Sequence, residues 1–202
     1  RKRCGTMKVR GCADGRPQRK YISKEESSSP TVSTHALMGQ CLINAIEERE
    51  VATVDIPAAF LQQDWDHKDE CYIRFDGVMV DMLLKICPEY APCVKVGRSG
   101  QRTMIAKLKK AIYGTLLAAR IFYDKLRSFL ESDGFEVNPY DKCTFNKVMN
   151  NNQCTIQFHV DDLMISHVDI SCIETCMENV YNEFGTLKPL QAVSGQVHEY
   201  LG

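Results

Sequence analysis

Two adjacent carboxylates, Asp161 and Asp162, lie between two strand-like apolar runs at residues 155–158 and 163–166. Such runs around a short polar segment predict a β-hairpin with both acids at its tip. Like charges side by side repel each other, and a bound cation relieves that repulsion. Carboxylate oxygens suit Mg²⁺, which completes its shell with water and substrate phosphates. Because Asp is a common turn residue, a solvated turn without chemistry is the alternative.

A third carboxylate, Asp55, ends a separate apolar run at residues 51–54. If this run forms a strand beside the hairpin, Asp55 and Asp161 converge at one edge of a sheet. Two Mg²⁺ ions about 3.5–4 Å apart at that edge would clamp an in-line phosphoryl displacement. Asp55 followed by Pro57 is by itself an ordinary way for a strand to end. The inference of a metal site therefore depends on the strands being neighbours.

Apolar periodicity predicts the elements that must position these acids. In chain order they are a helix at 34–50, a strand at 51–56, a helix at 116–132, strands at 143–148, 154–159 and 163–168, a helix that Asp169 caps and Gly185 ends, and a strand at 197–201. Strand, helix, two strands, helix and strand is the order of the split βαβ, ferredoxin-like arrangement. We therefore expect an α+β fold.

Two further regions carry weaker patterns. Residues 1–32 are basic and contain three glycines, which predicts short strands and loops. Residues 64–104 are interrupted by proline and glycine and predict strand-like pieces at 71–75 and 93–96 with a short helix at 79–86.

Length and composition set outer limits on the kind of protein. A chain of 202 residues with 44% hydrophobic residues can bury one large core or two small ones, so disorder is not expected. No apolar run approaches the roughly 20 residues of a membrane helix, and no apolar stretch follows the basic N-terminus as in a signal peptide. The ten cysteines form no CxxC pair, which favours reduced packing thiols over a disulfide framework or a structural zinc site.

The net charge of −1 conceals a strong segregation of charge along the chain. Residues 1–24 contain nine basic residues and one acid. Residues 98–127 hold eight basic residues against Asp124 alone. From His159 onward there are seven acids and one lysine. This pattern favours a surface for a polyanion beside a surface for cations. On charge alone, solvated helix faces are the simpler explanation.

Five blocks, in the right order along the chain, resemble those of copia-type LTR-retrotransposon reverse transcriptases. Residues 54–61 (VDIPAAFL) resemble the block DVKTAFLNG, and residues 108–114 (LKKAIYG) resemble LKKALYGLKQAPRAWY. Residues 158–163 (FHVDDL) resemble the YVDD block, residues 197–202 (VHEYLG) the HxYLG segment, and residues 8–10 (KVR) the fingers segment KARLV. Together these blocks cover nearly the whole chain.

The resemblance implies a two-metal nucleotidyl transferase with a right-hand polymerase fold. Asp55 and Asp161 would ligate both Mg²⁺ ions, for which Mn²⁺ could substitute, with Asp162 as the third carboxylate. The backbone carbonyl of Ile56 would help to hold the ion that carries the incoming dNTP. These roles follow from the family motifs and not from spacing.

The same resemblance assigns residues to the substrates. Phe60 matches the position whose ring blocks a ribose 2′-hydroxyl, although a core phenylalanine at a strand-to-helix turn would look the same. Lys8 and Arg10 match fingers residues that grip the triphosphate, with a solvated basic tail as the alternative. Tyr113 and Gly114 match the block that lines the pocket for the nucleotide and template.

Further basic residues would contact template-primer phosphates and give salt-dependent, sequence-independent binding. They are Lys107, Lys109, Lys110 and Arg120. His159 stands where the family usually has Tyr, which would alter the surface that grips the primer, or would be a strand-end residue with no chemical role. The block after Gly114 lacks the usual Lys, Gln and Pro, and Pro57 replaces a small or polar residue.

The implied domain plan is an incomplete reverse transcriptase over residues 1–202. Residues 1–28 and 64–114 would form the fingers, residues 29–63 and 115–202 a ferredoxin-like palm, and the thumb would be absent. Implied partners are an RNA or DNA template-primer, dNTP and the thumb, ribonuclease H and integrase of a polyprotein, with no membrane. The implied location is cytoplasmic, in a virus-like particle, or nuclear with the integration complex.

Two rival functions stay open at the level of sequence. The first is a decayed element that persists as a nucleic-acid-binding module without catalysis. The second is another palm-type phosphoryl-transfer enzyme, such as a nucleotide cyclase, which would share the split βαβ core and the paired carboxylates. Intact Asp55, Asp161 and Asp162 argue against full decay, and the Tyr113–Gly114 block argues against a cyclase.

Overall fold

Two antiparallel sheets organise the computed structural model, which describes residues 11–65, 70–195, 198 and 200. The helices are α1 (Lys24–Ser27), α2 (Thr34–Ile46), α3 (Ala59–Gln62), α4 (Val78–Ile86), α5 (Ala118–Ser132) and α6 (Ile170–Phe184), with 3₁₀ turns η1 (Arg16–Lys20) and η2 (Pro88–Cys93). The strands are β1 (Glu50–Asp55), β2 (Tyr72–Asp76), β3 (Val94–Val96), β4 (Arg102–Lys107), β5 (Glu136–Val137), β6 (Thr144–Met149), β7 (Asn152–His159), β8 (Asp162–His167) and β9 (Gln191–Ser194). The fold is therefore a mixture of helices and strands, as expected.

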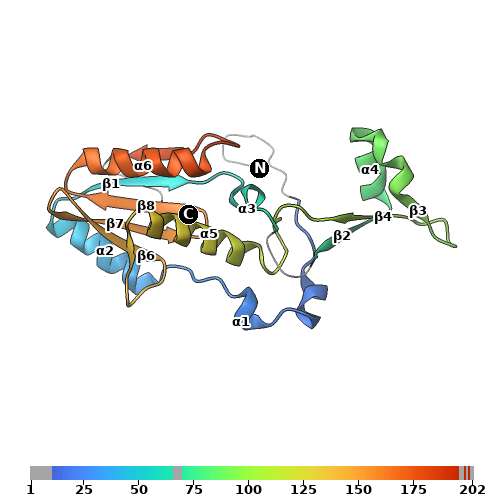
Figure 1. Cartoon of the computed structure of the whole chain (residues 1–202), viewed down its shortest axis with the longest axis horizontal. Coiled ribbons are helices and arrows are strands. Elements are labelled where there is room, and N and C mark those ends of the chain that lie inside the picture. The colour runs from blue at the N-terminus through green and yellow to red at the C-terminus, as the bar shows by residue number, and fades with distance from the viewer. Residues whose placement is uncertain (1–10, 66–69, 196–197, 199, 201–202) are drawn as a thin grey trace.

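The larger sheet has the strand order β5-β6-β7-β8-β1-β9 (Figure 1). Its apolar face packs against α5 and α6, where the rings of Phe122 and Phe184 meet edge to face with centroids 6.0 Å apart. Ile165 on β8 is fully buried, and Phe158 on β7 stacks on Phe145 of β6. Since side chains alternate along a strand, this face takes every second residue of the central strands.

The opposite face of the same sheet is polar and carries α2. Gln40 of α2 donates a hydrogen bond to the Ser166 hydroxyl at 3.0 Å and another to Asn44 at 2.7 Å. Gln157 of β7 donates to the backbone oxygen of Ala36. Helix α2 thus turns polar side chains toward the sheet, while Met38, Leu42 and Ile46 remain mostly exposed.

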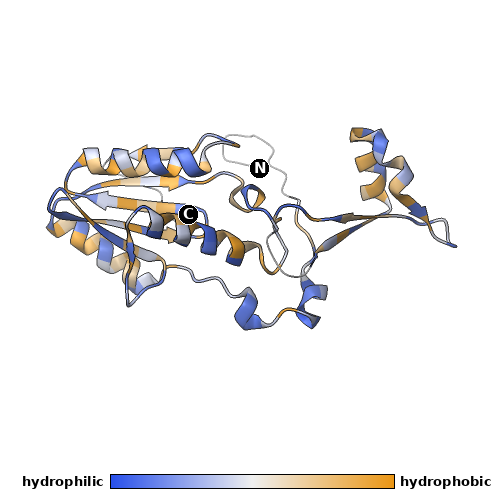
Figure 2. Ribbon diagram, in the orientation of Figure 1, coloured by the Kyte–Doolittle hydropathy of each residue, from blue (hydrophilic) through white to orange (hydrophobic). Residues whose placement is uncertain are grey.

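The smaller sheet has the order β2-β4-β3 and projects away from the larger one, with α4 beside it (Figure 1). Helix α4 is rich in apolar residues (Figure 2), and Val78, Met79, Met82 and Ile86 are each more than half exposed. Strand β4 is central and pairs with both β2 and β3. It is absent from the sequence-based prediction.

Several predicted boundaries move for local reasons. The helix expected at 34–50 ends at Ile46, because Glu48 adopts a left-handed backbone with φ 51° and the next strand starts at Glu50. Between the strands expected at 143–148 and 154–159, Asn150 and Asn151 form the turn, and both have positive φ, as asparagine tolerates. The strand predicted at 197–201 falls mostly outside the described residues, and β9 precedes it.

The expectation of short strands near the N-terminus is wrong for residues 11–32, which form η1 and α1 instead. Ser23 and Glu26 make a reciprocal capping box: the Ser23 hydroxyl accepts from the Glu26 N–H, and the Glu26 carboxylate accepts from the Ser23 N–H. This serine–glutamate spacing is itself a sequence signal for a helix start.

The cysteines in the described part of the chain are all free thiols, and four of them are buried. Burial raises the pKa of the Cys143 thiol to about 12, which keeps it protonated at neutral pH. Among the described residues, no helix combines the length and apolar character that a membrane span requires.

Candidate active site

The strand that ends at Asp55 and the hairpin that carries Asp161 and Asp162 are neighbours in the larger sheet. β1 pairs antiparallel with β8, and the register places Asp55 opposite Asp162. The backbone N–H of Ile56 donates to the carbonyl oxygen of Asp161 at 3.0 Å. The predicted convergence of these strands is therefore confirmed, and three acidic residues share one end of the sheet.

The hairpin tip is tighter than expected. His159 pairs with Asp162, so the turn consists of Val160 and Asp161, and Asp162 already belongs to β8. Val160 has a positive φ of 60°, which is rare for a β-branched residue and costs on the order of 1–3 kcal/mol. The rest of the hairpin must hold this conformation, and backbone strain of this kind clusters at functional sites.

The three acids influence one another electrostatically. Burial raises the pKa of Asp162 above its ordinary value of 3.8, and the nearby charges of Asp161 and Asp55 raise it further, while His159 opposes the shift. Among the described residues, no group of three or more His, Cys, Asp or Glu side chains is arranged to hold a metal ion. The donors nevertheless fit Mg²⁺, which proteins usually bind through one or two carboxylates together with substrate phosphates.

The raised pKa of Asp162, caused by burial and then by the neighbouring acids, leads to a stability prediction for the metal-free protein. Because the pKa of Asp162 is raised in the folded state, its penalty is absent below the unfolded value of 3.8 and grows as pH rises through the folded value. Asp162→Asn should therefore raise the free energy of unfolding at pH 7 by up to about 1 kcal/mol, after allowance for solvent screening. The gain should vanish near pH 3, where both proteins carry a neutral group. Urea titrations without divalent ions, at both pH values, test this, and an unchanged or lower stability at pH 7 would contradict it.

Two further side chains lie beside the acids: Tyr200, which was not singled out as a site residue in the sequence, and His159, which was. The hydroxyl of Tyr200 donates to the carbonyl oxygen of Asp162 at 3.3 Å, and burial raises the pKa of that hydroxyl. The Nδ1 atom of His159 is buried without a hydrogen-bond partner among the described residues. The block that contains Tyr200 was recognised, but contact with Asp162 joins segments 38 residues apart and leaves no local pattern.

The aromatic residues assigned to the nucleotide pocket lie together. The rings of Phe60, at the start of α3, and Tyr113 have centroids 4.5 Å apart. Phe60 also contacts Phe122 of α5 at 6.2 Å and is 8% exposed. Phe60 is thus part of the core as well as a neighbour of Tyr113.

A second backbone segment lies very close to Gly114, and this segment is residues 13–15 of the same chain. A Cβ atom on Gly114 would lie 2.0 Å from the carbonyl oxygen of Ala13, and Gly114 has a φ of 91°. The Ala13 N–H donates to the Tyr113 carbonyl at 2.8 Å, and a Cβ on Gly15 would lie 2.2 Å from the Gly114 carbonyl oxygen. The two glycines therefore let residues 13–15 cross the 113–114 loop in contact.

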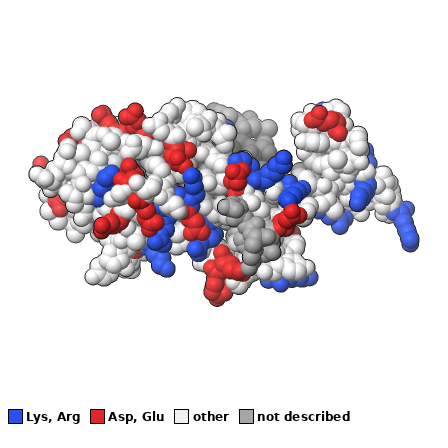
Figure 3. Space-filling view, viewed as in Figure 1, with Lys and Arg blue, Asp and Glu red and all other residues white. Residues whose placement is uncertain are grey.

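Most of the basic residues predicted to bind nucleic acid are engaged in ion pairs. Lys107 pairs with Glu70, Lys110 with Asp64 at 2.8 Å, and Arg120 with Asp124 at 2.7 Å. Within the described residues, Lys109 makes no ion pair. Lys8 and Arg10 lie outside the described residues. Figure 3 accordingly shows basic and acidic side chains interspersed over one face of the molecule rather than a continuous basic surface.

Comparison with known proteins places residues 90–202, more than half of the chain, in a match to the family model "Reverse transcriptase (RNA-dependent DNA polymerase)". A Retrovirus-related Pol polyprotein from transposon TNT 1-94 of Nicotiana tabacum is 27% identical over 192 residues, covering 93% of this chain and 13% of that protein. The Transposon Ty1-NL2 Gag-Pol polyprotein of Saccharomyces cerevisiae is 27% identical over 188 residues, covering 92% and 9%. The chain thus spans about a tenth of the length of these relatives.

Among solved structures, apo telomerase from Candida tropicalis, truncated from its C-terminal domain, is similar with a TM-score of 0.43. The sequence identity is 11%, and the match covers 91% of this chain and 39% of that one. Telomerase from Candida albicans in complex with a fragment of telomeric RNA gives a TM-score of 0.40 at 11% identity, with 89% of this chain and 33% of that chain covered.

Proposed function

We propose that this chain, which belongs to the copia-type retrotransposon branch of the reverse transcriptase (RNA-dependent DNA polymerase) family, extends a DNA primer on an RNA or DNA template. The observation that carries the proposal is the β1–β8 register, which puts Asp55 opposite Asp162 beside the Asp161 turn. The parent molecule is a Pol polyprotein with ribonuclease H and integrase, working in a cytoplasmic virus-like particle or in the nucleus.

The larger sheet fits the palm of such a polymerase. β1, α5, β7, β8, α6 and β9 follow the split βαβ order, and β1 lies between β8 and β9. We assign residues 29–63 and 115–202 to the palm, and residues 1–28 and 64–114, with the smaller sheet, to the fingers.

The acids at the sheet end are the proposed metal ligands. Asp55 and Asp161 would hold two Mg²⁺ ions, or Mn²⁺ in their place, with Asp162 and the backbone carbonyl of Ile56 beside them. When bound, such ions activate the primer 3′-hydroxyl and stabilise charge on the leaving phosphates. Burial raises the pKa of Asp162, and the charges of Asp161 and Asp55 raise it further, so a bound cation would be favourable at this end of the sheet.

The remaining residues orient substrate. Phe60, held by its contacts with Tyr113 and Phe122, would close the space that a ribose 2′-hydroxyl needs and so select dNTP. Gly114 would support this pocket indirectly, because its loop is in contact with residues 13–15. Lys8 and Arg10 would bind the triphosphate, and His159 would contact the primer.

The basic residues can bind phosphates despite their ion pairs. Lys107, Lys110 and Arg120 are exposed, and exposed ion pairs contribute only about 0–1 kcal/mol, so a nucleic-acid phosphate can replace the acidic partner. Lys109 is available without such an exchange. Binding to template-primer should weaken steeply as salt concentration rises.

Primer extension tests the proposal. The 202-residue chain is mixed with a DNA primer annealed to an RNA template and with dNTP, and extension is followed with Mg²⁺ and with a chelator. Extension that requires the metal ion is the expected result. Retained binding of template-primer without any synthesis, even when the adjoining polyprotein segment is restored, would favour the non-catalytic binding module.

A further inference from the structure

Three sulfur atoms from three different elements lie in contact, toward the end of the larger sheet opposite the proposed catalytic acids. The Sγ atoms of Cys154 on β7 and Cys176 on α6 are 3.9 Å apart. The Sδ atom of Met149, at the end of β6, is 3.8 Å from the Sγ atom of Cys176. Both cysteines are almost completely buried, with exposed fractions of 0% and 2%. The fold thus builds a cluster of one thioether and two thiols, which the proposed polymerase reaction does not use.

The spacing of these sulfurs fits a shared metal ion better than a disulfide. A bond between thiolate sulfur and zinc is about 2.3 Å long, so sulfurs around a planar three-coordinate ion with similar bonds lie about 4 Å apart. A disulfide would instead require the sulfurs of Cys154 and Cys176 to approach to about 2.05 Å. These two residues belong to a strand and a helix that the buried core holds in place. An ion between the sulfurs therefore needs less rearrangement than a disulfide.

The ligand types select among metal ions. Thiolate and thioether sulfur favour a soft ion such as Cu(I), whereas Mg²⁺ requires oxygen ligands. A structural zinc site needs four ligands, usually from cysteine, histidine or carboxylate. In the described part of the chain, no third residue of these types joins the two thiols. Cu(I), which accepts a thioether, is therefore the ion that this set of sulfurs fits best.

The two thiols must lose their protons when the ion binds, because thiolate is the form that binds metals. The hydrogen bond between them lowers the pKa of Cys176, so this thiol ionises first. The same hydrogen bond, and then burial, raise the pKa of Cys154, while the guanidinium of Arg49 opposes that shift. The side chain of Arg49 is itself 4% exposed. A buried cation near the cluster thus favours the negative charge that Cu(I) and two thiolates carry together.

The cluster can be reached from the turn that joins β6 and β7. Met149 is only half-buried, and Asn150 beside it is exposed. Cys172 lies one helical turn before Cys176 on α6, and its Sγ atom accepts a hydrogen bond from the Asn150 side chain at 3.3 Å. A Cu(I) ion bound first at Cys172 can move to the buried sulfurs by exchange of one thiolate for another.

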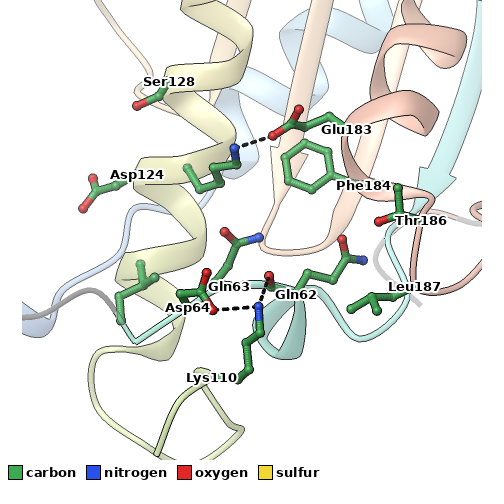
Figure 4. Close-up of a pocket in the computed structure, with 12 residues that line it drawn as sticks. Gln62, Gln63, Asp64, Lys110, Asp124, Ser128, Glu183, Phe184, Thr186 and Leu187 are labelled. Atoms are coloured by element: carbon green, nitrogen blue, oxygen red, sulfur yellow. Dashed lines mark hydrogen bonds and ion pairs between the residues drawn. The ribbon is translucent and has the colours of Figure 1, made fainter. Parts of the chain in front are cut away.

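A cavity of about 700 Å³ between α3, α5 and the C-terminal end of α6 gives no comparable indication of a ligand (Figure 4). Its lysines are already paired, Lys110 with Asp64 and Lys125 with Glu183. In the described residues that line it, no buried side-chain nitrogen or oxygen atom lacks a hydrogen-bond partner. The sulfur cluster is therefore the stronger candidate for a second site.

We propose that Met149, Cys154 and Cys176 bind one Cu(I) ion in a three-coordinate sulfur site. The ion would join β6 and β7 to α6 and so stabilise the folded chain. The site differs from the proposed catalytic site in its position and in its metal, because one uses sulfur and the other carboxylate oxygen. It does not depend on the polymerase proposal.

Competition with a Cu(I) chelator under anaerobic, reducing conditions tests the site in the full 202-residue chain. One equivalent of Cu(I) should resist the chelator, and X-ray absorption should show three sulfur ligands at about 2.3 Å. Met149→Leu, which keeps the size and removes the thioether, should bind at least about tenfold more weakly and show two sulfurs. Cys176→Ser should retain no ion. Complete loss of Cu(I) to the chelator, or unchanged binding by Met149→Leu, would overturn the proposal.

Two further variants and an unfolding measurement separate the site from other thiols and from catalysis. Cys93→Ser makes the same change at an exposed thiol and should still retain one equivalent, so a loss there would overturn the proposal. Cu(I) should raise the urea midpoint of the parent chain but not that of Met149→Leu to the same extent. If Cys176→Ser unfolds without metal, Met149→Leu decides, because it adds no polar atom to the core. Asp161→Asn should retain Cu(I) normally, whatever becomes of the polymerase proposal.

Discussion

Asp161→Asn should lower the rate of Mg²⁺-dependent primer extension by about 10³-fold or more, because it removes a carboxylate aimed at charge that develops in the reaction. The fold should tolerate the change. Asp161 holds β1 through its backbone carbonyl, which accepts from Ile56, and its side chain is not needed for that contact. Loss of extension with intact binding of template-primer is thus the expected combination.

Asp169→Asn is the matched control for this substitution. Asp169 lies at the other end of β8, where its carboxylate caps α6 by accepting from the Ser171 N–H at 2.9 Å. Asparagine caps a helix about as well as aspartate, so the variant makes the same chemical change outside the site. Its extension rate should stay within about twofold of the parent chain. Normal extension by Asp161→Asn would refute the proposed metal site.

Gly114→Ala should destabilise the protein by about 2–4 kcal/mol, from backbone strain at its positive φ and loss of the Ala13–Tyr113 hydrogen bond. The added methyl group would overlap the Ala13 carbonyl oxygen, which is backbone and cannot rotate away. Residues 11–28 should then detach, so trypsin should cut within η1 faster than in the parent chain. Urea unfolding and timed digestion measure the two effects.

Gly39→Ala makes the same chemical change, but it should stabilise the protein. Gly39 lies inside α2, and a Cβ there would meet no atom within 4 Å. Alanine is the better helix former, so this variant should gain roughly 0.5–1 kcal/mol. Equal stability of Gly114→Ala and the parent chain would mean that residues 13–15 do not rest on the 113–114 loop.

The sequence predicted the elements whose signals are local. Asn150 and Asn151 mark their own turn, Asp169 marks a helix start, and the apolar run before Asp55 marks a strand. From these patterns, and from recognisable blocks, the meeting of Asp55 with the 161–162 hairpin could be expected from the sequence alone. The assignment of these acids to metal binding still rests on their resemblance to the motifs of the reverse transcriptase family.

The missed features depend on distant partners. β4 is a strand because β2 and β3 flank it, and its own residues alternate only weakly. The space beside Gly114 was expected to admit a ligand, yet Ala13 occupies it from about 100 residues away in the chain. Likewise, Lys110 looks like a free cation in the sequence, and only the fold brings Asp64 to it.

Helix α2, which turns polar side chains toward the sheet, affects how precisely it is positioned on the strands. An apolar interface would let a helix slide by part of a turn at small cost, because dispersion contacts have no direction. The Gln40–Ser166 and Gln157–Ala36 hydrogen bonds have direction, and each buried group left unpaired by a slide costs about 1–3 kcal/mol. Helix α2 therefore has a single favoured position on the sheet. This position fixes its distance from the strands that end at Asp55 and begin at Asp162.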